Sequence, residues 1–214
     1  LESFVSSCDV IVHLAGVNRA NSNEEVYSSN IEINNSLKKA LINTSFKGHL
    51  IFASSFQEDS DSLYGKAKKE SRLFLEQTIS ELGGKYTGLI IPNVFGPFCR
   101  PNYNSFVATF CSKILIDQTP KIFNDSDVPL VYIDSLIRQI VKNIELKNEL
   151  KLINISSDIE IKVSEVLRIL KHFKNSYLKE NRLPLFNNSF EFNLFNTFRG
   201  YINLEKTFPV YLKK

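Results

Sequence analysis

Short apolar runs alternate with longer amphipathic segments over the first half of the chain. The runs at 8–16, 48–55 and 86–91 are nearly continuous in apolar or small residues, which is typical of buried parallel strands. The segments 21–44 and 64–82 have apolar residues at helical spacing and predict helices that cross over the sheet. This order predicts an α/β fold with a Rossmann-like, doubly wound parallel sheet. In the second helix we expect four buried positions: Leu73, Phe74, Ile79 and Leu82.

The elements predicted beyond the third strand are shorter. We expect a loop at 92–97, a helix from a cap within 102–105 to about 116, an extended piece at 128–133, a helix from Asp134 to about 144, a strand at 151–155, and a helix that Ser164 caps and that runs through 173. We interpret residues 1–148 as a nucleotide-binding core. Residues 97–125 are expected to contribute to a small mixed substrate-binding lobe, which residues 149–214 mainly form.

Composition narrows the class of protein. The chain has 214 residues, 43% hydrophobic and 23% charged, which suits an ordinary globular domain. Because the net charge is only +3, we interpret the basic run 66–72 as a solvated helix face and expect no nucleic-acid partner. Three cysteines outside any disulfide framework, and no apolar run long enough for a membrane span, predict a cytoplasmic protein. Since it begins at Leu1 and contains no Met, we expect a piece of a longer chain.

Ser55, Tyr64 and Lys68 are the candidate catalytic residues. Tyr64 and Lys68 are four residues apart and so lie one turn apart on the same helix face. Ser55 can donate a hydrogen bond to a carbonyl oxygen, and Tyr64 can give that oxygen a proton. A nearby ammonium favours the phenolate, so Lys68 is expected to lower the pKa of Tyr64 from about 10. The same spacing also occurs by chance in helices, and the surrounding motifs decide between these interpretations.

The first predicted strand ends in small residues. Leu14-Ala15-Gly16 would let a ligand approach the backbone closely at the carboxyl edge of the sheet, where open α/β sheets bind ligands. His13 precedes them, and we interpret it as a packed, hydrogen-bonded side chain rather than a base. The three histidines, His13, His49 and His172, are too dispersed to predict a metal site.

Five motifs in order resemble the extended short-chain dehydrogenase/reductases that act on nucleotide sugars: His13-Leu14-Ala15-Gly16, Ser54-Ser55, Tyr64-x-x-x-Lys68, the 92–97 segment and Val131-Tyr132-Ile133-Asp134. The segments 13–19, 54–57, 98–105 and 108–111 are similar to one subfamily. Its members reduce the 4-keto group of a UDP-2-acetamido-2,6-dideoxy-hexulose on the route to UDP-N-acetyl-L-fucosamine. The resemblance implies a reductase domain that uses NADPH, with NADH possible, and a separate metal-holding cupin domain.

The resemblance also implies roles for individual residues. Ser55 would orient the carbonyl, Tyr64 would donate the proton, and Lys68 would hold the nicotinamide ribose. The other residues expected near the cofactor are Leu14, Ala15, Gly16, Asn30, Ala53, Ser54, Pro92, Asn93, Val94 and Phe95. The substrate-side candidates are Asn18, Arg19, Gln57, Asn93, Arg100, Asn102 and Asn104. The fork of Arg100 suits a diphosphate, although a surface arginine is an equal alternative.

The chain departs from the family pattern in several places. The Gly-rich pyrophosphate loop and the first strand are missing and would precede Leu1, and no cupin His cluster follows. Ala67 stands where Ser is usual before the catalytic Lys, and the strand at 89–91 is apolar where an Arg is common.

Two other functions stay open. One is a non-catalytic nucleotide-sugar or dinucleotide-binding fragment, against which the intact Ser, Tyr and Lys argue. The other is a nucleotide-sugar epimerase or dehydratase; Phe56-Gln57 after Ser55 is not the acidic pair that dehydratases typically carry. The expected partners are a UDP-sugar substrate and, by analogy with the family, a second copy in a homodimer.

Overall fold

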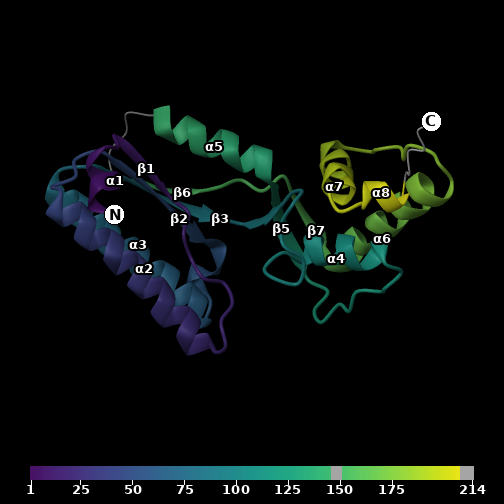
Figure 1. The fold of residues 1–214 in the computed structure, drawn as a ribbon, viewed down its shortest axis with the longest axis horizontal. Helices are drawn as coiled ribbons and strands as arrows, with labels where there is room; N and C mark the ends of the chain where they lie inside the picture. The colour runs from purple at the N-terminus through teal and green to yellow at the C-terminus, as the bar shows by residue number, and fades with distance from the viewer. Residues whose placement is uncertain (146–150, 208–214) are drawn as a thin grey trace, which may run out of the picture. The chain divides into compact units, whose positions relative to one another are not determined.

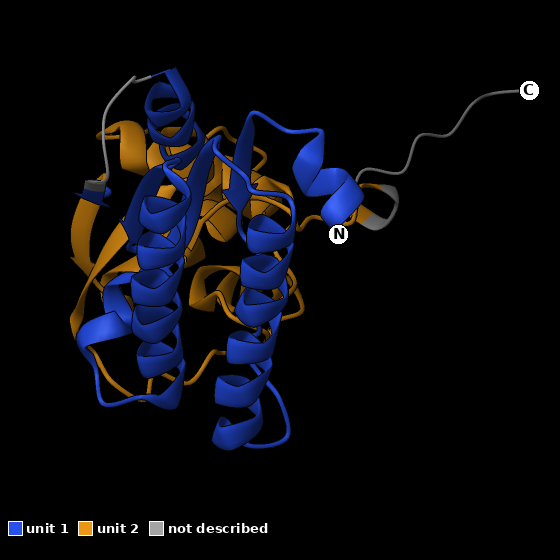
Figure 2. Cartoon of the chain, turned by 90° about the vertical axis from the view of Figure 1, so that its left-hand side faces the viewer, with its two compact units in different colours: residues 1–92, 136–156 blue, residues 93–135, 157–214 orange. Residues whose placement is uncertain are grey.

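The computed structural model describes residues 1–145 and 151–207, and the chain forms two compact units (Figure 2). Unit 1 comprises residues 1–92 and 136–156, and unit 2 comprises residues 93–135 and the chain from residue 157 onward. Helix α5 (Ile133–Glu145) begins in unit 2 and continues into unit 1. The chain therefore passes from unit 1 to unit 2 and back before it enters unit 2 again.

Unit 1 is built on a parallel sheet, as predicted, and this sheet has four strands. Its strands, in spatial order, are β1 (Val10–His13), β2 (His49–Ser55), β3 (Lys85–Ile91) and β6 (Lys151–Asn154). The register aligns Val10 with His49, and Thr87 with Lys151. The last of these strands, which we expected in the substrate-binding lobe, therefore extends the sheet of unit 1.

Helices cover the sheet of unit 1 on both faces. Helix α1 (Glu2–Ser6) precedes β1, and the long helices α2 (Asn23–Asn43) and α3 (Leu63–Leu82) lie side by side over one face (Figures 1 and 2). Figure 1 draws α5 on the opposite face. Serine caps start both long helices, and Gly83, with φ of 73°, ends α3 in the left-handed conformation.

The core of unit 1 lies between the sheet and these two helices. Its fully buried side chains include Leu41, Leu50, Phe52, Leu75 and Ile79. Each such side chain stabilises the fold by about 1.5–3 kcal/mol through burial. This core fixes α3 against β2, and the contact between these two elements positions the candidate site.

Two expectations about α3 are wrong. Leu73 is 50% exposed, because the helix face toward the sheet runs through Ser71 and Leu75 instead. The basic run is only partly solvated: Lys66 and Lys69 are exposed, whereas Lys68 and Arg72 are buried. The two buried cations are four residues apart and so share the face that packs on the sheet.

Unit 2 has a small mixed sheet. Strand β4 (Asn93–Phe95) is parallel to β5 (Asp127–Tyr132), which is antiparallel to β7 (Ile159–Lys162). Its other elements are α4 (Phe106–Leu115), α6 (Val163–Phe173), the π-helical turn η2 (Lys174–Lys179), α7 (Ser189–Arg199) and α8 (Leu204–Thr207). Residues 93–95 were expected in a loop, and β7 and α7 were not predicted. Ser164 lies inside α6, whose N-cap is Lys162.

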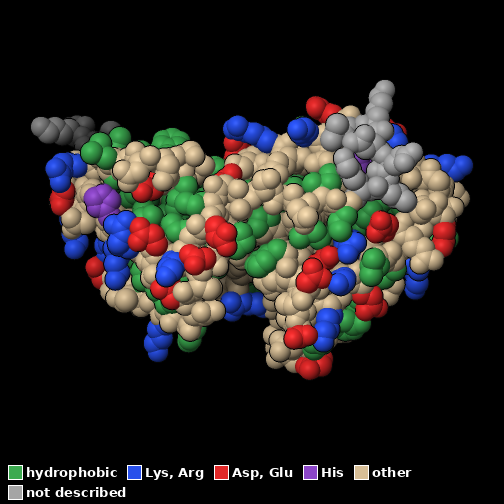
Figure 3. Space-filling model, turned by 180° about the vertical axis from the view of Figure 1, so that it is seen from behind, with side chains coloured by type: hydrophobic (Ala, Val, Ile, Leu, Met, Phe, Trp, Pro, Cys, Tyr) green, Lys and Arg blue, Asp and Glu red, His purple; other side chains and the backbone are tan. Residues whose placement is uncertain are grey.

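The core of unit 2 is rich in phenylalanine. Phe173 packs edge-on against Phe195, with ring centroids 5.3 Å apart, and both side chains are buried. Ser105 caps α4 as expected, because its hydroxyl accepts from the backbone of Ala108. In the part of the chain that the structure describes, no helix has both the length and the apolar character to cross a membrane. Basic and acidic side chains are interspersed on the face drawn in Figure 3.

Candidate active site

The carboxyl end of β2 carries the two adjacent serines. The Ser55 hydroxyl accepts a hydrogen bond from the backbone of Gln57 at 3.2 Å and so caps the short 3₁₀ helix η1 (Phe56–Asp59). Ser54 points its hydroxyl the other way and donates to Glu58 Oε2 at 2.6 Å. Both serines are buried. Their two hydrogen bonds hold the end of β2 against η1.

Tyr64 lies in the first turn of α3, opposite the end of β2. Ser62 caps this helix by accepting from the backbone of Gly65 at 3.0 Å. Burial raises the pKa of the half-buried Tyr64 phenol, and a hydrogen bond from Ser55 opposes that rise. The structure therefore brings Ser55 and Tyr64 together, as the sequence predicts.

The expectation that Lys68 lowers the pKa of Tyr64 is wrong. The pKa of Tyr64 is raised rather than lowered, because burial outweighs the stabilisation of the phenolate. The Lys68 side chain directs Nζ over the ring of Phe52, 4.6 Å from the ring centroid. Tyr64 is consequently a protonated phenol at neutral pH, which is the form that a proton donor needs.

Lys68 is the most perturbed cation of the site. Its side chain is only 4% exposed, and burial lowers its pKa from 10.5 to about 8. The negative charge of Glu58 opposes this decrease. Lys68 therefore remains mostly an ammonium at neutral pH, although it is close to losing its proton.

The loop after β1 lies beside Lys68. Asn30 on α2 holds this loop: its Oδ1 accepts from Val17 N at 3.1 Å, and its Nδ2 donates to Val17 O at 2.7 Å. A Cβ atom added at Gly16 would lie 3.0 Å from Asn30 Oδ1 and 3.7 Å from Lys68 Nζ. His13 is hydrogen-bonded to Asn34 and stacked on Phe52, as expected of a packed histidine.

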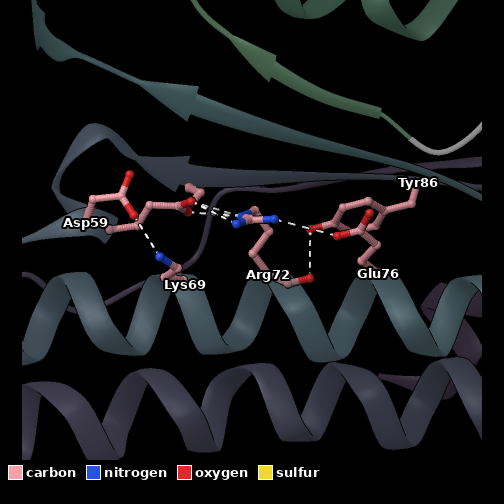
Figure 4. Close-up of polar contacts among 7 residues, drawn as sticks. Asp59, Lys69, Arg72, Glu76 and Tyr86 are labelled. Atoms are coloured by element: carbon pink, nitrogen blue, oxygen red, sulfur yellow. Dashed lines mark hydrogen bonds and ion pairs between the residues drawn. The ribbon is translucent and has the colours of Figure 1, made fainter.

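A buried ion pair that was not predicted from the sequence lies next to these residues. Arg72 Nη2 lies 2.9 Å from Glu58 Oε1, and Arg72 Nε donates to both oxygens of the same carboxylate. Figure 4 shows Arg72 reaching from α3 toward the sheet, while Asp59 and Lys69 form a separate, exposed pair. The available signal was the position of Arg72, one turn beyond Lys68 on the same helix face.

The remaining candidates of unit 1 have diverse surroundings. Leu14, Ala15 and Gly16 are exposed, Ala53 is half-buried, and Pro92 is buried. Among the substrate-side candidates, Asn18 is half-buried, whereas Arg19 and Gln57 are exposed. Their predicted contacts with a cofactor or substrate stay predictions.

The other candidates belong to unit 2. Asn93 and Val94 are half-buried on β4, while Phe95 is buried among the aromatic side chains of the core. Arg100, Asn102 and Asn104 are exposed on the segment before α4, and the Arg100 guanidinium lies 5.9 Å from the ring centroid of Tyr103. Their roles also stay predictions. Among the described residues, no group of three His, Cys, Asp or Glu side chains could hold a metal ion.

The residues around β1 and α3 fit a nicotinamide dinucleotide. Residues 14–16 are exposed at the carboxyl end of a parallel strand, and the lack of a side chain at Gly16 leaves room beside Asn30 and Lys68. The Lys68 ammonium beside it is a donor suited to ribose hydroxyls. A buried cation next to this exposed strand end favours a polar or anionic group of a ligand.

A parallel α/β sheet with Ser55 at the carboxyl end of β2, and with Tyr64 and Lys68 on the helix α3 that packs against it, is the arrangement of the short-chain dehydrogenase/reductase class. Within this class the chain belongs to the NAD dependent epimerase/dehydratase family, whose sequence profile matches residues 1–156.

Several known proteins are similar to this chain. A UDP-2-acetamido-2,6-beta-L-arabino-hexul-4-ose reductase of Pseudomonas aeruginosa is 36% identical over 179 residues, which are 82% of this chain and 48% of that protein. The capsular polysaccharide assembling protein CapF of Staphylococcus aureus is 28% identical with a TM-score of 0.79, over 99% of this chain and 56% of its own. A UDP-glucose 4-epimerase of Thermotoga maritima shares the fold, with 21% identity and a TM-score of 0.77, over 94% of this chain and 81% of its own. The chain thus spans about half the length of the curated reductase that it matches.

Proposed function

We propose that the protein reduces the 4-keto group of a UDP-linked 2-acetamido-2,6-dideoxy-hexulose with NADPH or NADH. The observation that carries this proposal is the pairing of Ser55 with a protonated, half-buried Tyr64 at the carboxyl end of β2, one helical turn from the buried Lys68. The resemblance to a reductase of such a sugar over most of the chain supports the choice of substrate.

The chain supplies the acid half of the reaction. The reduced nicotinamide supplies a hydride when it is bound. Tyr64 gives its phenolic proton to the carbonyl oxygen of the sugar, and Ser55 donates a hydrogen bond to the same oxygen. Solvent then returns a proton to the Tyr64 phenolate. The net change is the addition of one hydride and one proton, which converts a ketone into an alcohol.

The finer features of the proposal follow the resemblance. We propose NADPH as the preferred cofactor, unit 2 as the part that binds the sugar nucleotide, and a homodimer in the cytoplasm as the working form. Arg100 is the proposed contact to the diphosphate, because its guanidinium is exposed and can donate several hydrogen bonds at once. The product would enter the synthesis of a capsule or O-antigen sugar.

The experiment compares wild type with Tyr64→Phe and Ser55→Ala in the complete protein. Binding of NADPH is measured by fluorescence, and turnover of a UDP-linked 4-keto sugar by the loss of absorbance at the nicotinamide band. We expect Tyr64→Phe to bind NADPH like wild type and to lose turnover by about 100-fold or more, since it removes only the proton donor.

Three results would contradict the proposal. Equal turnover in Tyr64→Phe would remove Tyr64 from the chemistry. NADPH binding without any turnover of 4-keto sugars in the wild type would favour a non-catalytic binding protein. Conversion of a UDP-sugar into its 4-epimer with no net oxidation of NADPH would favour an epimerase.

A further inference from the structure

Glu58 connects the end of β2 with the buried face of α3. Its carboxylate is only 6% exposed, accepts the Ser54 hydroxyl at 2.6 Å and receives two Arg72 nitrogens at 2.9–3.2 Å. Arg72 in turn lies 3.6 Å from Glu76, and its backbone carbonyl accepts the Tyr86 hydroxyl at 3.2 Å. One carboxylate thus joins the strand end beside Ser55 to the helix that carries Tyr64 and Lys68.

The Lys68 ammonium is surrounded by groups of mixed charge. The negative charge of Glu58 on η1 raises the pKa of Lys68. On α3, the helix of Lys68, the neutral Tyr64 lies one turn before the lysine and the cationic Arg72 one turn after it. Burial lowers the pKa of His13 on β1, and the positive charge of Lys68 lowers it further. Asn30 on α2 and Phe52 on β2 add no charge. Glu58 is therefore what opposes the cost of burying the Lys68 charge.

We propose that Glu58 is a positioning residue of the reductase site, which keeps the buried Lys68 as an ammonium and, through Ser54, fixes the end of β2 that presents Ser55. Arg72 holds the Glu58 carboxylate in place with its planar fork. This inference rests on the proposed reductase function for its catalytic consequence. The effect on the charge of Lys68 is independent of any reaction.

Stability alone is a weak reason for such an arrangement. Replacing a buried ion pair by apolar side chains of similar volume is often neutral or stabilising. The Glu58–Arg72 pair, however, lies where its anion acts on Lys68 and its acceptor oxygen holds Ser54. Its location next to two predicted site residues is what distinguishes it from the exposed Asp59–Lys69 pair, with the lysine side chain 47% and the aspartate side chain 79% exposed.

The central test compares Glu58→Gln with the matched control Asp59→Asn. Both remove one negative charge from adjacent residues of η1, and the glutamine retains an oxygen that can accept from Ser54. The protonation of Lys68 is followed without cofactor by acetic anhydride labelling across pH 7–11, with the Lys68 peptide quantified by mass spectrometry. In wild type the labelling rate should rise through a midpoint near pH 8.

Removing the anion takes away the contribution that raises the pKa of Lys68, so the midpoint in Glu58→Gln moves to lower pH. Asp59→Asn should label like wild type. In the complete protein, kcat of Glu58→Gln at pH 7.5 should fall about 10- to 100-fold, with a smaller change in KM, because the catalytic groups shift relative to the substrate. Ser54→Ala should lower kcat without moving the labelling midpoint.

Because Glu58→Gln leaves Arg72 buried without its carboxylate, the variant Glu58→Gln/Arg72→Met provides a second measurement if the single variant fails to fold. Its labelling midpoint should also lie below that of wild type. An unchanged midpoint in the folded variant would overturn the inference, even if turnover fell. If the midpoint moves while Tyr64→Phe retains full turnover, the inference on Lys68 stands and the proposed function fails.

Discussion

Gly65 on α3 lies against the backbone carbonyl of Gln57, so closely that a Cβ atom at Gly65 would be 2.0 Å from that oxygen. Such a distance cannot be accommodated without moving the backbone of η1 or α3. The absence of a side chain next to Tyr64 therefore lets the helix approach the strand end that carries Ser55. The sequence motif around Tyr64 includes this glycine for a steric reason that its spacing alone does not reveal.

Gly65→Ala is expected to destabilise the protein and to separate Tyr64 from Ser55. The free energy of unfolding should fall by about 3 kcal/mol or more, because the clash is with backbone rather than a flexible side chain. Urea denaturation measures this change. The control is Gly83→Asn, since Gly83 has no atom within 4 Å of an added Cβ and asparagine tolerates its left-handed conformation. Equal stabilities of the two variants would contradict the steric argument.

Lys68→Met is expected to stabilise the protein while it abolishes turnover. Burial lowers the pKa of Lys68 from 10.5 to about 8, which corresponds to a cost of about 3 kcal/mol for the charged form at neutral pH. Methionine fills a similar volume without this cost, and Glu58 retains its pairing with Arg72. Urea denaturation at pH 7 should therefore show a more stable variant.

The stability that Lys68→Met gains over wild type should decrease as the pH rises. The folded-state pKa of Lys68 is lowered, so between about pH 8 and 10.5 the unfolded chain binds more protons than the folded chain. The contribution of Lys68 to wild-type stability hence rises with pH over this range, and the advantage of Lys68→Met shrinks. Denaturation at pH 7 and pH 10 tests this; a constant advantage would mean that Lys68 is not desolvated as described.

The sequence predicted the parallel sheet and its long helices because their patterns are local. The first three strands of unit 1 lie in nearly continuous runs of apolar or small residues, and the two long helices have apolar residues at helical spacing. Ser55, Tyr64 and Lys68 were found for the same reason: a strand end and a helix face are both visible in a short window. The bounds of α3 differ from the prediction by one residue at its start.

The features that were not predicted from the sequence depend on contacts between residues that are distant in the chain. Arg72 resembled a solvated cation because its carboxylate partner, Glu58, lies fourteen residues earlier in the chain. The 93–95 segment is a strand only because β5 pairs with it, and α7 has no strict apolar period since its buried aromatics pack on several elements. Burial also decided the pKa of Tyr64, and the spacing of Tyr64 and Lys68 carried no information on desolvation.

Asn30→Ala is expected to loosen the loop after β1. Asn30 is fully buried and makes three hydrogen bonds with backbone groups, two of them to Val17. Losing them leaves buried backbone groups unpaired, so the free energy of unfolding should fall by about 1–3 kcal/mol. Faster hydrogen exchange at the Val17 amide would locate the effect in this loop. The exposed Asn35 provides the control: Asn35→Ala should change neither quantity.

His13 is expected to be a neutral imidazole with its hydrogen on Nε2. This nitrogen lies 2.8 Å from Asn34 Oδ1, while Asn34 Nδ2 donates to Asn30 O at 2.7 Å. The amide orientation fixes Oδ1 as an acceptor, so Nε2 must donate. Burial lowers the pKa of His13, and the positive charge of Lys68 adds to that effect. Long-range proton–nitrogen NMR spectra across pH 5–8 would show the tautomer and the midpoint directly.

Because the folded-state pKa of His13 is lowered below 6.5, its contribution to stability is complete above pH 6.5 and decreases as the pH falls toward the folded-state value. Asn34→Asp places a carboxylate against Nε2 and should raise the pKa of His13 above 6.5. The pH dependence of the His13 contribution to stability then has the opposite sign. Its contribution would then be complete below pH 6.5 and lost as the pH rises through the new value. Urea denaturation at pH 5.5 and 8 should therefore show a smaller deficit for the variant at the lower pH; a larger deficit there would mean that the aspartate does not pair with the imidazole.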